Sequence, residues 1–185
     1  LDRDNRIADI NIVTAHMRGG MMFATITILI LAGVMTILGN LGKAREVTSH
    51  LSFAVEASQE MWEIKLIVLL LIFVYAFFKY AWCLRQFNYT LIFIGAAPLP
   101  EEVNVRERKD YPQWGARLFD RGIGTFNRGL RAIYFALSAA AWLLGPEALI
   151  GATGITCLML LRREFASQSR AVLLQPDRPD ENTHT

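Results

Sequence analysis

The feature that most constrains this chain is a long apolar run, residues 19–39, which reads GGMMFATITILILAGVMTILG and contains no ionisable side chain. A helix of this length is about 31 Å long, which matches the hydrocarbon core of a bilayer. Because the bilayer interior has no water to hydrogen-bond an open backbone, such a segment crosses it as a helix. The alternative, a buried helix of a large soluble core, is a poor explanation for a chain of 185 residues with further apolar segments.

Further apolar segments predict additional membrane helices. The second contains Lys65 and Lys79, which bracket an uncharged run and can extend their ammonium groups toward opposite headgroup layers. Gly145-Pro146 separates the last two segments, because proline cannot continue the helical hydrogen-bond ladder. The sequence predicts an all-α fold, a polytopic membrane helical bundle with short interfacial amphipathic helices and four transmembrane helices at about 19–39, 61–84, 125–144 and 147–161.

The segments outside these spans are polar. Residues 1–18 are predicted to be a cytoplasmic amphipathic segment, because apolar side chains recur there at helical spacing. Residues 40–63 are predicted to be an aqueous connection that is helical in its second half. Residues 98–124 are rich in Pro and Gly and are predicted to be a loop, with a short amphipathic helix near 114–119 as an option. The transmembrane domain covers 19–173, and the polar tail 174–185 is predicted to be disordered.

The basic side chains predict the orientation of the chain. Sixteen of the nineteen Lys and Arg residues lie before the first span, at the end of the second, in the following loop or in the tail. The other side carries three, Lys43, Arg45 and Lys65. Because basic residues are enriched in cytoplasmic segments, the residue-1 end and the C-terminus are predicted to be cytoplasmic.

A first group of polar side chains lies at the end of the second apolar segment and comprises Lys79, Arg85, Gln86 and Asn88. At about 100° per residue they share a depth rather than one helix face. Headgroup contact explains them, and a cytoplasmic cavity, a partner protein and catalysis remain as alternatives. The spacing of Trp82 and Arg85 predicts a cation–π contact. The following residues are predicted to continue the helix, tilted or broken, in the inner interface until a proline at position 98.

A second group comprises Asn127, Arg131 and Tyr134, which share one helical face. Arg131 lies inside an apolar segment, where a guanidinium needs partners. A snorkelling arginine explains the pattern. The alternatives are a hydrogen-bond link to the second span and an anionic-lipid phosphate site, with Asp120 or Glu164 as counter-charge.

A third group is the basic surface of the loop and tail. Positive-inside topology explains it, and binding of anionic lipid headgroups follows naturally. Acidic side chains interleave with the basic ones, so no nucleic acid is expected as a partner. The group comprises Arg106, Arg108, Lys109, Arg117, Arg121, Arg128, Arg162 and Arg163.

The sequence contains no motif for catalysis, metal binding or a cofactor. CxxC, HExxH, P-loop and GxSxG patterns are absent from it, and its three histidines lie outside the predicted spans. No cofactor and no metal site are therefore predicted. Cys83 and Cys157 are expected to be packing residues. An enzyme acting on lipids remains a hypothesis, with Glu164, His16 or Asp120 as the reactive group.

Several stretches of the chain resemble a known family. They are DNRIADINIV, LIFVYAFFKYAWCLRQFNYTLIFIGAAP and LRREFASQSRAVL, and they resemble the bacterial integral-membrane family catalogued as domain of unknown function 599, over about residues 4–173. The resemblance implies the bacterial inner (cytoplasmic) membrane and supplies no activity. It also implies one more apolar segment upstream of Leu1, so the chain is expected to begin after a first transmembrane helix.

The leading prediction is a non-enzymatic membrane protein, a structural or accessory subunit that packs against other membrane proteins or itself. Small residues between 138 and 154 motivate it, because they allow helices to approach closely in lipid. Membrane lipids are the further predicted partners. The alternative is a small transporter or lipid-binding protein with a polar site at the level of Lys79, Gln86 and Arg131.

Overall fold

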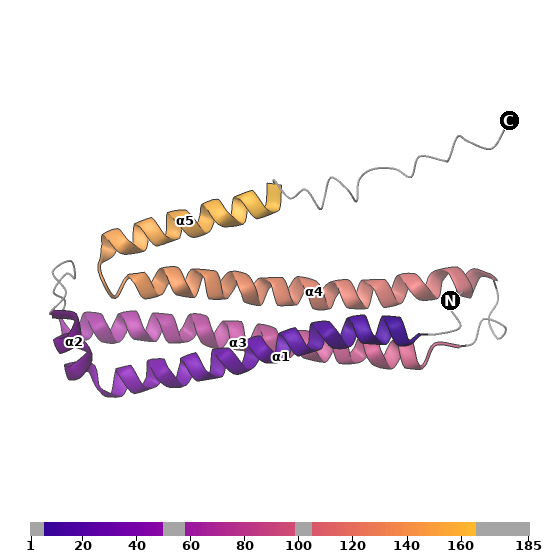
Figure 1. Ribbon diagram of the computed structural model, residues 1–185, viewed down its shortest axis with the longest axis horizontal. Helices are drawn as coiled ribbons and strands as arrows, with labels where there is room; N and C mark the ends of the chain where they lie inside the picture. The colour runs from indigo at the N-terminus through magenta and orange to yellow at the C-terminus, as the bar shows by residue number, and fades with distance from the viewer. Residues whose placement is uncertain (1–5, 50–57, 99–104, 166–185) are drawn as a thin grey trace.

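The computed structural model describes residues 6–49, 58–98 and 105–165, and within these ranges the chain forms five helices and no strand. The all-α prediction is therefore confirmed for this part of the chain. Three long helices run along an elongated bundle, a short one covers one end, and the last lies on the outside (Figure 1). They are α1 (Ile7–Gly39), α2 (Leu41–Ser49), α3 (Gln59–Gly95), α4 (Val105–Ala141) and α5 (Pro146–Phe165).

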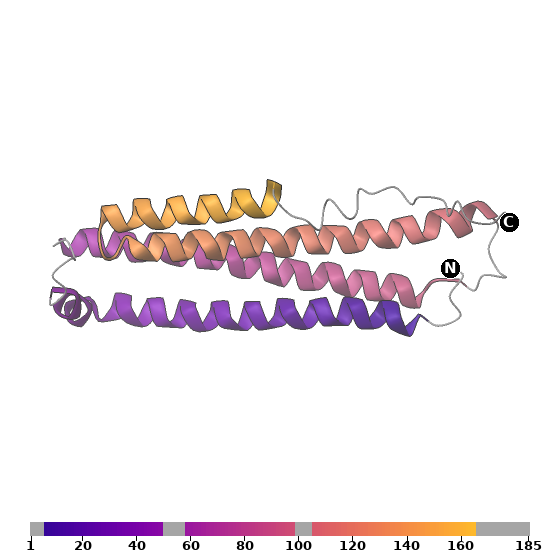
Figure 2. The same ribbon diagram turned by 45° about the horizontal axis from the view of Figure 1, so that its top comes forward.

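Helix α3 is the centre of the bundle. It packs along α1 on one side and along α4 on the other, and α5 packs on α4 (Figure 2). Helices α1 and α4 meet through long side chains, such as the ring of Phe23 edge-on to Phe126 at 5.6 Å between centroids. Helix α3 packs between α1 and α4, so these two helices meet through their side chains. The size of those side chains therefore sets how much space is left between α1 and α4.

The contact between α3 and α4 follows a repeat of seven residues. Aromatic rings of α3 lie on small residues of α4, in the pairs Phe73 with Ala136, Tyr80 with Gly129 and Phe87 with Gly122. A Cβ at Gly122 would stand 2.6 Å from the Phe87 ring, and one at Gly129 would stand 2.9 Å from Tyr80. A strict seven-residue repeat keeps one seam between two helices, and small residues let the backbones approach.

The bundle has two sections along its length. The four-helix section contains residues 19–39, 59–84, 125–141 and 146–165. The three-helix section contains residues 7–18, 85–95 and 105–124, beyond the reach of α5 (Figures 1 and 2). The predicted amphipathic segment before the first span is therefore the first third of α1 and continuous with it.

Within the described residues, two helices, α1 and α3, are long and apolar enough to cross a membrane. Only 17% and 33% of their most apolar windows are buried inside the molecule, whereas a core helix of a soluble protein is mostly buried. Four such helices were predicted, so that number is wrong by this measure. The other two predicted spans contain charged residues. These are Arg128 and Arg131 in the apolar half of α4, and Glu147, Arg162 and Arg163 in α5.

The predicted loop at 98–124 is also wrong for the residues described, because 105–124 belong to α4. Pro112, Gly115 and Gly122 suggested a loop, since proline and glycine break isolated helices. In α4, Gly115 and Gly122 instead face the rings of Phe93 and Phe87. Tertiary packing thus outweighs local propensity here.

Two other connections differ in detail from the prediction. The connection after α1 is helical in its first half, as α2, and again from Gln59, where α3 begins, while residues 50–57 lie outside the described part. Helix α3 runs without a break to Gly95, so the predicted continuation beyond Lys79 is confirmed. The predicted disordered tail lies outside the described residues.

The turn between α4 and α5 follows the prediction. Helix α4 ends at Ala141, Gly145 is buried, and Pro146 is the first residue of α5. Proline suits the first position of a helix, because its missing N–H has no helical partner there. The hydroxyl of Ser138 ties the helices together, at 2.7 Å from the Thr156 hydroxyl.

Lys65 does not extend outward as predicted. Its side chain is 6% exposed, and its Nζ lies 5.5 Å from the centroid of the Trp142 ring. Trp142 directly follows α4, so the ammonium lies at the C-terminal end of that helix. The negative end of the helix dipole and the face of the ring both favour a cation in this position.

Candidate functional site

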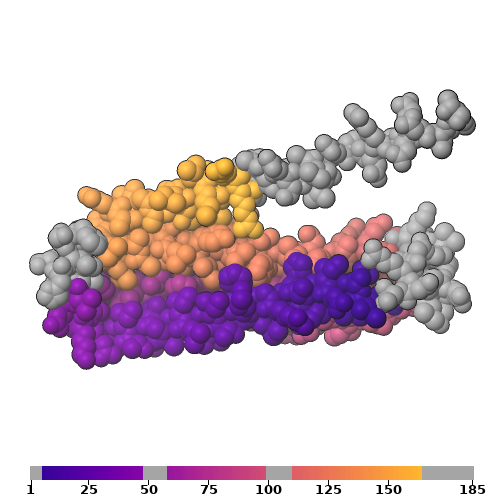
Figure 3. Space-filling model, in the orientation of Figure 1, coloured from indigo at the N-terminus to yellow at the C-terminus, as the bar shows by residue number. Residues whose placement is uncertain are grey.

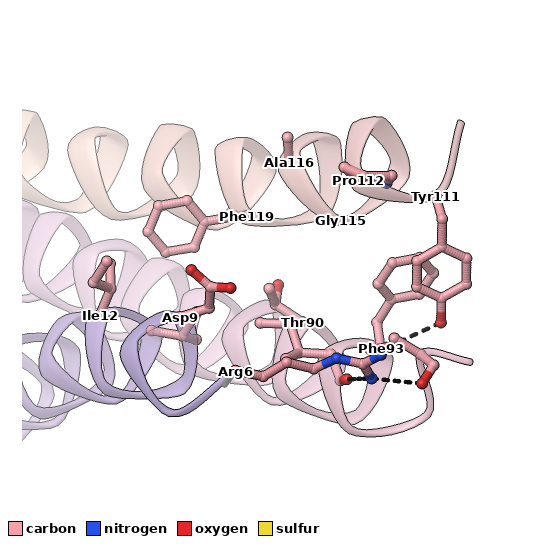
Figure 4. A pocket seen from close by; sticks show the side chains of 13 residues that line it. Arg6, Asp9, Ile12, Thr90, Phe93, Tyr111, Pro112, Gly115, Ala116 and Phe119 are labelled. Atoms are coloured by element: carbon pink, nitrogen blue, oxygen red, sulfur yellow. Dashed lines mark hydrogen bonds between the residues drawn. The ribbon is translucent and has the colours of Figure 1, made fainter. Parts of the chain in front are cut away.

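A cavity of about 610 Å³ lies in the three-helix section, where α1 begins, α3 ends and α4 begins (Figure 4). Its volume is within the range of small-molecule sites, and its walls are mostly apolar, as in such sites. It is lined by Arg6, Asp9, Ile12, Val13, Thr90, Phe93, Ile94, Ala97, Tyr111, Pro112, Gly115, Ala116 and Phe119.

Each of the three helices contributes one face to the cavity. Lining residues recur every three or four positions, which is the spacing of one side of a helix. On α4 the lining side chains are small at Gly115 and Ala116 and large at Tyr111 and Phe119 on either side of them. A Cβ at Gly115 would stand 3.3 Å from the Phe93 ring. Small residues on α4 opposite α1 therefore leave the space open.

Arg6 joins the start of α1 to the end of α3. Its guanidinium donates hydrogen bonds to the carbonyls of Ile94, Ala97 and Pro98, and the last of these is 2.7 Å long. The last carbonyls of a helix have no partner within the helix, and they carry its negative dipole. Arg6 therefore satisfies the end of α3 with charge-assisted hydrogen bonds and closes this side of the cavity.

Tyr111 joins α4 to the same end of α3. Its ring stacks on Phe93, with centroids 4.3 Å apart and planes 18° from parallel. Its hydroxyl donates to the Phe93 carbonyl at 3.1 Å. Figure 4 shows both hydrogen-bonded contacts, from Arg6 and from Tyr111, at the same end of the cavity. The end of α3 is thus held from two sides.

Asp9 and Thr90 are the remaining polar side chains of the lining. Asp9 lies in the first turn of α1, where a carboxylate is favoured by the helix dipole. Figure 4 shows its carboxylate directed from α1 toward the side of α4 that carries Phe119. Thr90 is 2% exposed and donates its hydroxyl to the Gln86 carbonyl at 3.0 Å. Asp9 is the one acidic side chain in the lining.

In the described part of the chain, none of the eight candidate residues from the sequence lines this cavity. Lys79 is half-buried, with its Nζ 4.9 Å from the Tyr75 ring centroid. Arg85 is exposed and lies 5.6 Å from the Trp82 ring, so the predicted cation–π contact is confirmed. Arg85 also donates to the Tyr89 hydroxyl at 2.6 Å. The role of these residues at lipid headgroups stays a prediction.

Gln86 links α3 to α4 inside the bundle. Its Oε1 lies 3.0 Å from the hydroxyl of Thr125, a side chain that is 1% exposed. Arg128 donates to the same hydroxyl at 3.1 Å. Gln86 therefore holds the continuation of α3 against a neighbouring helix, whereas Asn88 is exposed.

In the second candidate group, Asn127 contacts α5. Arg163 donates to the Oδ1 of Asn127 at 3.4 Å, which brings two candidate residues together. Tyr134 is half-buried, and its carbonyl accepts a hydrogen bond from Ser138, a residue that also contacts α5. Arg131 is exposed. A hydrogen-bond link of this face to the second span stays a prediction, and the described contact of Asn127 is with α5.

The candidate reactive groups of the enzyme hypothesis are His16, Asp120 and Glu164. His16 is exposed, with its ring 5.2 Å from Phe119 and its Nδ1 2.9 Å from the Ile12 carbonyl. Asp120 is exposed on α4, and the side chain of Glu164 is outside the described set. No cluster of three or more His, Cys, Asp or Glu suited to a metal was found among the described residues. The two cysteines differ, since Cys83 is buried and Cys157 is exposed.

Sequence reasoning missed the residues that build the cavity. Arg6, Asp9 and Tyr111 lie in segments that were taken for an amphipathic surface and a loop. One signal was present, because Gly115, Gly122 and Gly129 recur at the spacing of the aromatic residues on α3. That shared repeat predicts a paired seam that continues into the supposed loop.

The fold and the site define an all-helical bundle with two helices that could span a membrane and an apolar cavity at one end. The chain belongs to the family described as "Protein of unknown function, DUF599", whose family model matches residues 1–169. The resemblance noted in the sequence is thereby confirmed. No curated protein and no solved structure matches the chain. Its function must therefore be argued from the cavity and the surfaces.

Proposed function

We propose that the protein is a non-enzymatic integral membrane protein that binds an amphiphile, such as a membrane lipid, in the cavity between α1, α3 and α4. The observation that carries this proposal is the cavity itself, with apolar walls and a few polar groups near helix ends. A ligand with a hydrocarbon body and a polar end matches that distribution.

The location of the cavity supports the same ligand class. Helices α3 and α4 are each about 56 Å long, whereas the hydrocarbon core of a bilayer is about 30 Å thick. If the apolar four-helix section occupies the core, the three-helix section projects from it, and the cavity lies near the headgroups.

The charge asymmetry of the sequence orients this arrangement. Sixteen of the nineteen Lys and Arg residues belong to segments predicted to be cytoplasmic, which include the helix ends around the cavity. By the positive-inside rule, that end faces the cytoplasm, together with the residue-1 end and the C-terminus. The proposed location is the bacterial inner membrane, with the cavity on its cytoplasmic side.

The proposal is tested by filling the cavity. The full chain is purified in mild detergent with Ala116→Trp, which places a large ring in the lining, and with Gln113→Trp as matched control. Gln113 is exposed on the same turn of α4 and does not line the cavity. Native mass spectrometry should show bound lipid on the unaltered chain and the control, and at least about tenfold less on Ala116→Trp. Equal lipid on all three would overturn the proposal.

A second candidate function, an accessory subunit, is favoured by the outer face of α5. Ile150, Ile155 and Leu158 are each at least 69% exposed. A Cβ at Gly151 or Gly154 would meet nothing within 4 Å, so a helix could approach closely there. Cross-linking through the exposed Cys157 in membranes tests this, because an accessory subunit should yield one discrete larger species. A monomer throughout would count against it.

A further inference from the structure

A second hollow of the molecule is an apolar groove between α3 and α4, in the four-helix section. It has a volume of about 400 Å³, and its walls are Val68, Leu71, Ile72 and Tyr75 of α3 with Ala132 of α4. Leu71 and Tyr75 are 60% and 49% exposed, so the groove is open toward the surroundings of the bundle. In a membrane, the surroundings of this section are hydrocarbon chains.

The groove is about one bilayer leaflet long and has a basic residue at its end. Lys79 follows Tyr75 by one turn on the same side of α3, and its Nζ lies 4.9 Å from the centroid of the Tyr75 ring. From Val68 to Lys79 the helix rises about 17 Å, close to half of a hydrocarbon core of about 30 Å. A partner helix that spans the membrane would need the full thickness of the core. An acyl chain of one leaflet therefore fits this length better, and it places its headgroup near Lys79.

Helix α4 adds a second cation at the same level. Arg128 precedes Ala132 by one turn on the same side of α4, and its side chain is exposed. Because α3 and α4 run antiparallel and Tyr80 packs on Gly129, Arg128 lies within about one turn of Lys79 along the bundle axis. This end of the groove thus has one basic residue on each of its two helices.

Acidic residues lie away from this end on both helices. Helix α3 has none after Glu63, and α4 has none after Asp120, which precedes Arg128 by eight residues or about 12 Å along the axis. Helix α5 brings a further basic residue, Arg163, to this level of α4 through its hydrogen bond to Asn127. The charge that α3 and α4 contribute at this end of the groove is therefore positive.

We infer that this groove binds an acidic phospholipid, with one acyl chain along its walls and the phosphate at Lys79 and Arg128. The ammonium group attracts the phosphate, and Arg128, which donates one hydrogen bond to the Thr125 hydroxyl at 3.1 Å, has further N–H groups to donate to it. Basic side chains at the level of the headgroups favour anionic lipids in the same way. The inference goes beyond the proposed function, because the groove and the cavity share no lining residue.

The test titrates the full chain with lipid in mild detergent and measures binding by native mass spectrometry. The two probes are dioleoyl-phosphatidylglycerol and dioleoyl-phosphatidylcholine, which have the same acyl chains and differ in net charge. Phosphatidylglycerol should bind at least about tenfold more tightly to the unaltered chain, because two cations face its phosphate. Lys79→Gln combined with Arg128→Gln should remove this preference. Arg18→Gln combined with Arg117→Gln, which removes two exposed arginines outside the groove, should retain it.

A second arm of the test fills the groove. Leu71→Trp places a large ring at the exposed wall and should weaken the binding of both phospholipids about fivefold or more, since the acyl chain loses its apolar contacts. Ile67→Trp is the matched control, because Ile67 is exposed on the same helix and does not line the groove. Ala116→Trp, which fills the cavity, should leave the preference for phosphatidylglycerol unchanged.

Each outcome supports or overturns the inference. Equal binding of the two phospholipids to the unaltered chain overturns it, and this result needs no variant to fold. An equal loss in the Arg18 and Arg117 pair also overturns it, because the preference would then come from the general surface charge. If Ala116→Trp removes the preference and Leu71→Trp does not, the lipid lies in the cavity, so the inference fails and the proposed function stands. If Leu71→Trp weakens binding and Ala116→Trp does not, the inference holds and the proposed function fails. Circular dichroism verifies folding, and Lys79→Gln alone, which should lower the preference, replaces a double variant that does not fold.

Discussion

The four-helix and three-helix sections have the same kind of interior and different exteriors. Inside, rings of α3 lie on small residues of α4 in both sections, as with Tyr80 on Gly129 and Phe93 on Gly115. Outside, most of the exposed large apolar side chains belong to the four-helix section, such as Leu29, Leu71 and Ile155, whereas the three-helix section has fewer, such as Ile7 and Ile92. Helix pairing thus follows from the interior repeat, and the exterior reflects the surroundings of each section.

The seam between α3 and α4 is looser at the cavity than along the rest of its length. A Cβ would stand 2.6 Å from a ring at Gly122 and 2.9 Å at Gly129, but 3.3 Å at Gly115. The looser contact belongs to the three-helix section and lies at the cavity wall. The seam therefore opens toward the end of the bundle where a ligand could enter.

The largest expected effect comes from adding atoms to the tight part of the seam. Gly122→Leu should destabilise the protein by about 3 kcal/mol, since overpacking a close contact displaces the buried Phe87 ring. Gly115→Ala, at the looser contact, should cost less than Gly122→Ala. Thermal unfolding in detergent measures the series. Gly124→Ala is the control, because a Cβ there meets nothing within 4 Å and alanine favours the helix. Equal losses at 115 and 122 would contradict the looser packing of the seam at the cavity.

A smaller and local effect is expected from Arg6→Ala. Removing charged hydrogen bonds to the carbonyls of Ile94, Ala97 and Pro98 should destabilise the three-helix section by about 1.5–3 kcal/mol. Hydrogen exchange should accelerate at the end of α3 and stay unchanged in the four-helix section. Arg18→Ala, an exposed arginine of the same helix, is the control. Uniform acceleration along α3 would show that the two sections do not open separately.

The smallest effect is expected in the four-helix section from Ser138→Ala. The hydroxyl lies 2.7 Å from Thr156 and 3.3 Å from the Ala152 carbonyl, and its loss should cost about 1 kcal/mol. Proteolysis should then cut α5 faster while ligand binding in the cavity is retained. Thr36→Ala, which loses a hydrogen bond within α1 only, should leave α5 unchanged. If Ser138→Ala also reduced ligand binding, the two sections would be energetically coupled, which would contradict their independence.

The sequence predicted the four-helix section better than the three-helix section, for a physical reason. A long apolar run and a proline at position 146 carry local signals, so α1, α3 and the start of α5 could be placed from them. The start of α4 carries a misleading local signal, because Pro112 and Gly115 suggest a loop while packing against α3 makes them helical. The number of membrane-capable helices was overestimated, since charges at the ends of short apolar segments were read as boundaries.

The cavity could not be predicted in the same way. Its walls come from three helices, and the contact that closes it joins Arg6 to Ile94, 88 residues apart. Gln86 and Asn127 were singled out as polar candidate residues and lie well inside α3 and α4, and their partners, Thr125 and Arg163, depend on helix arrangement. Periodicity assigns residues to a face, but it does not say which faces meet.

The contact of Arg6 with the end of α3 has a consequence for biosynthesis. Arg6 emerges from the ribosome early, whereas its farthest partner, Pro98, follows 92 residues later. At ordinary translation rates this delay is on the order of ten seconds. During that time the start of α1 cannot adopt its final contacts, and a nascent chain that stops within α3 lacks them altogether. The cavity is therefore a late product of synthesis, assembled after α1 and α3 have already paired along most of their length.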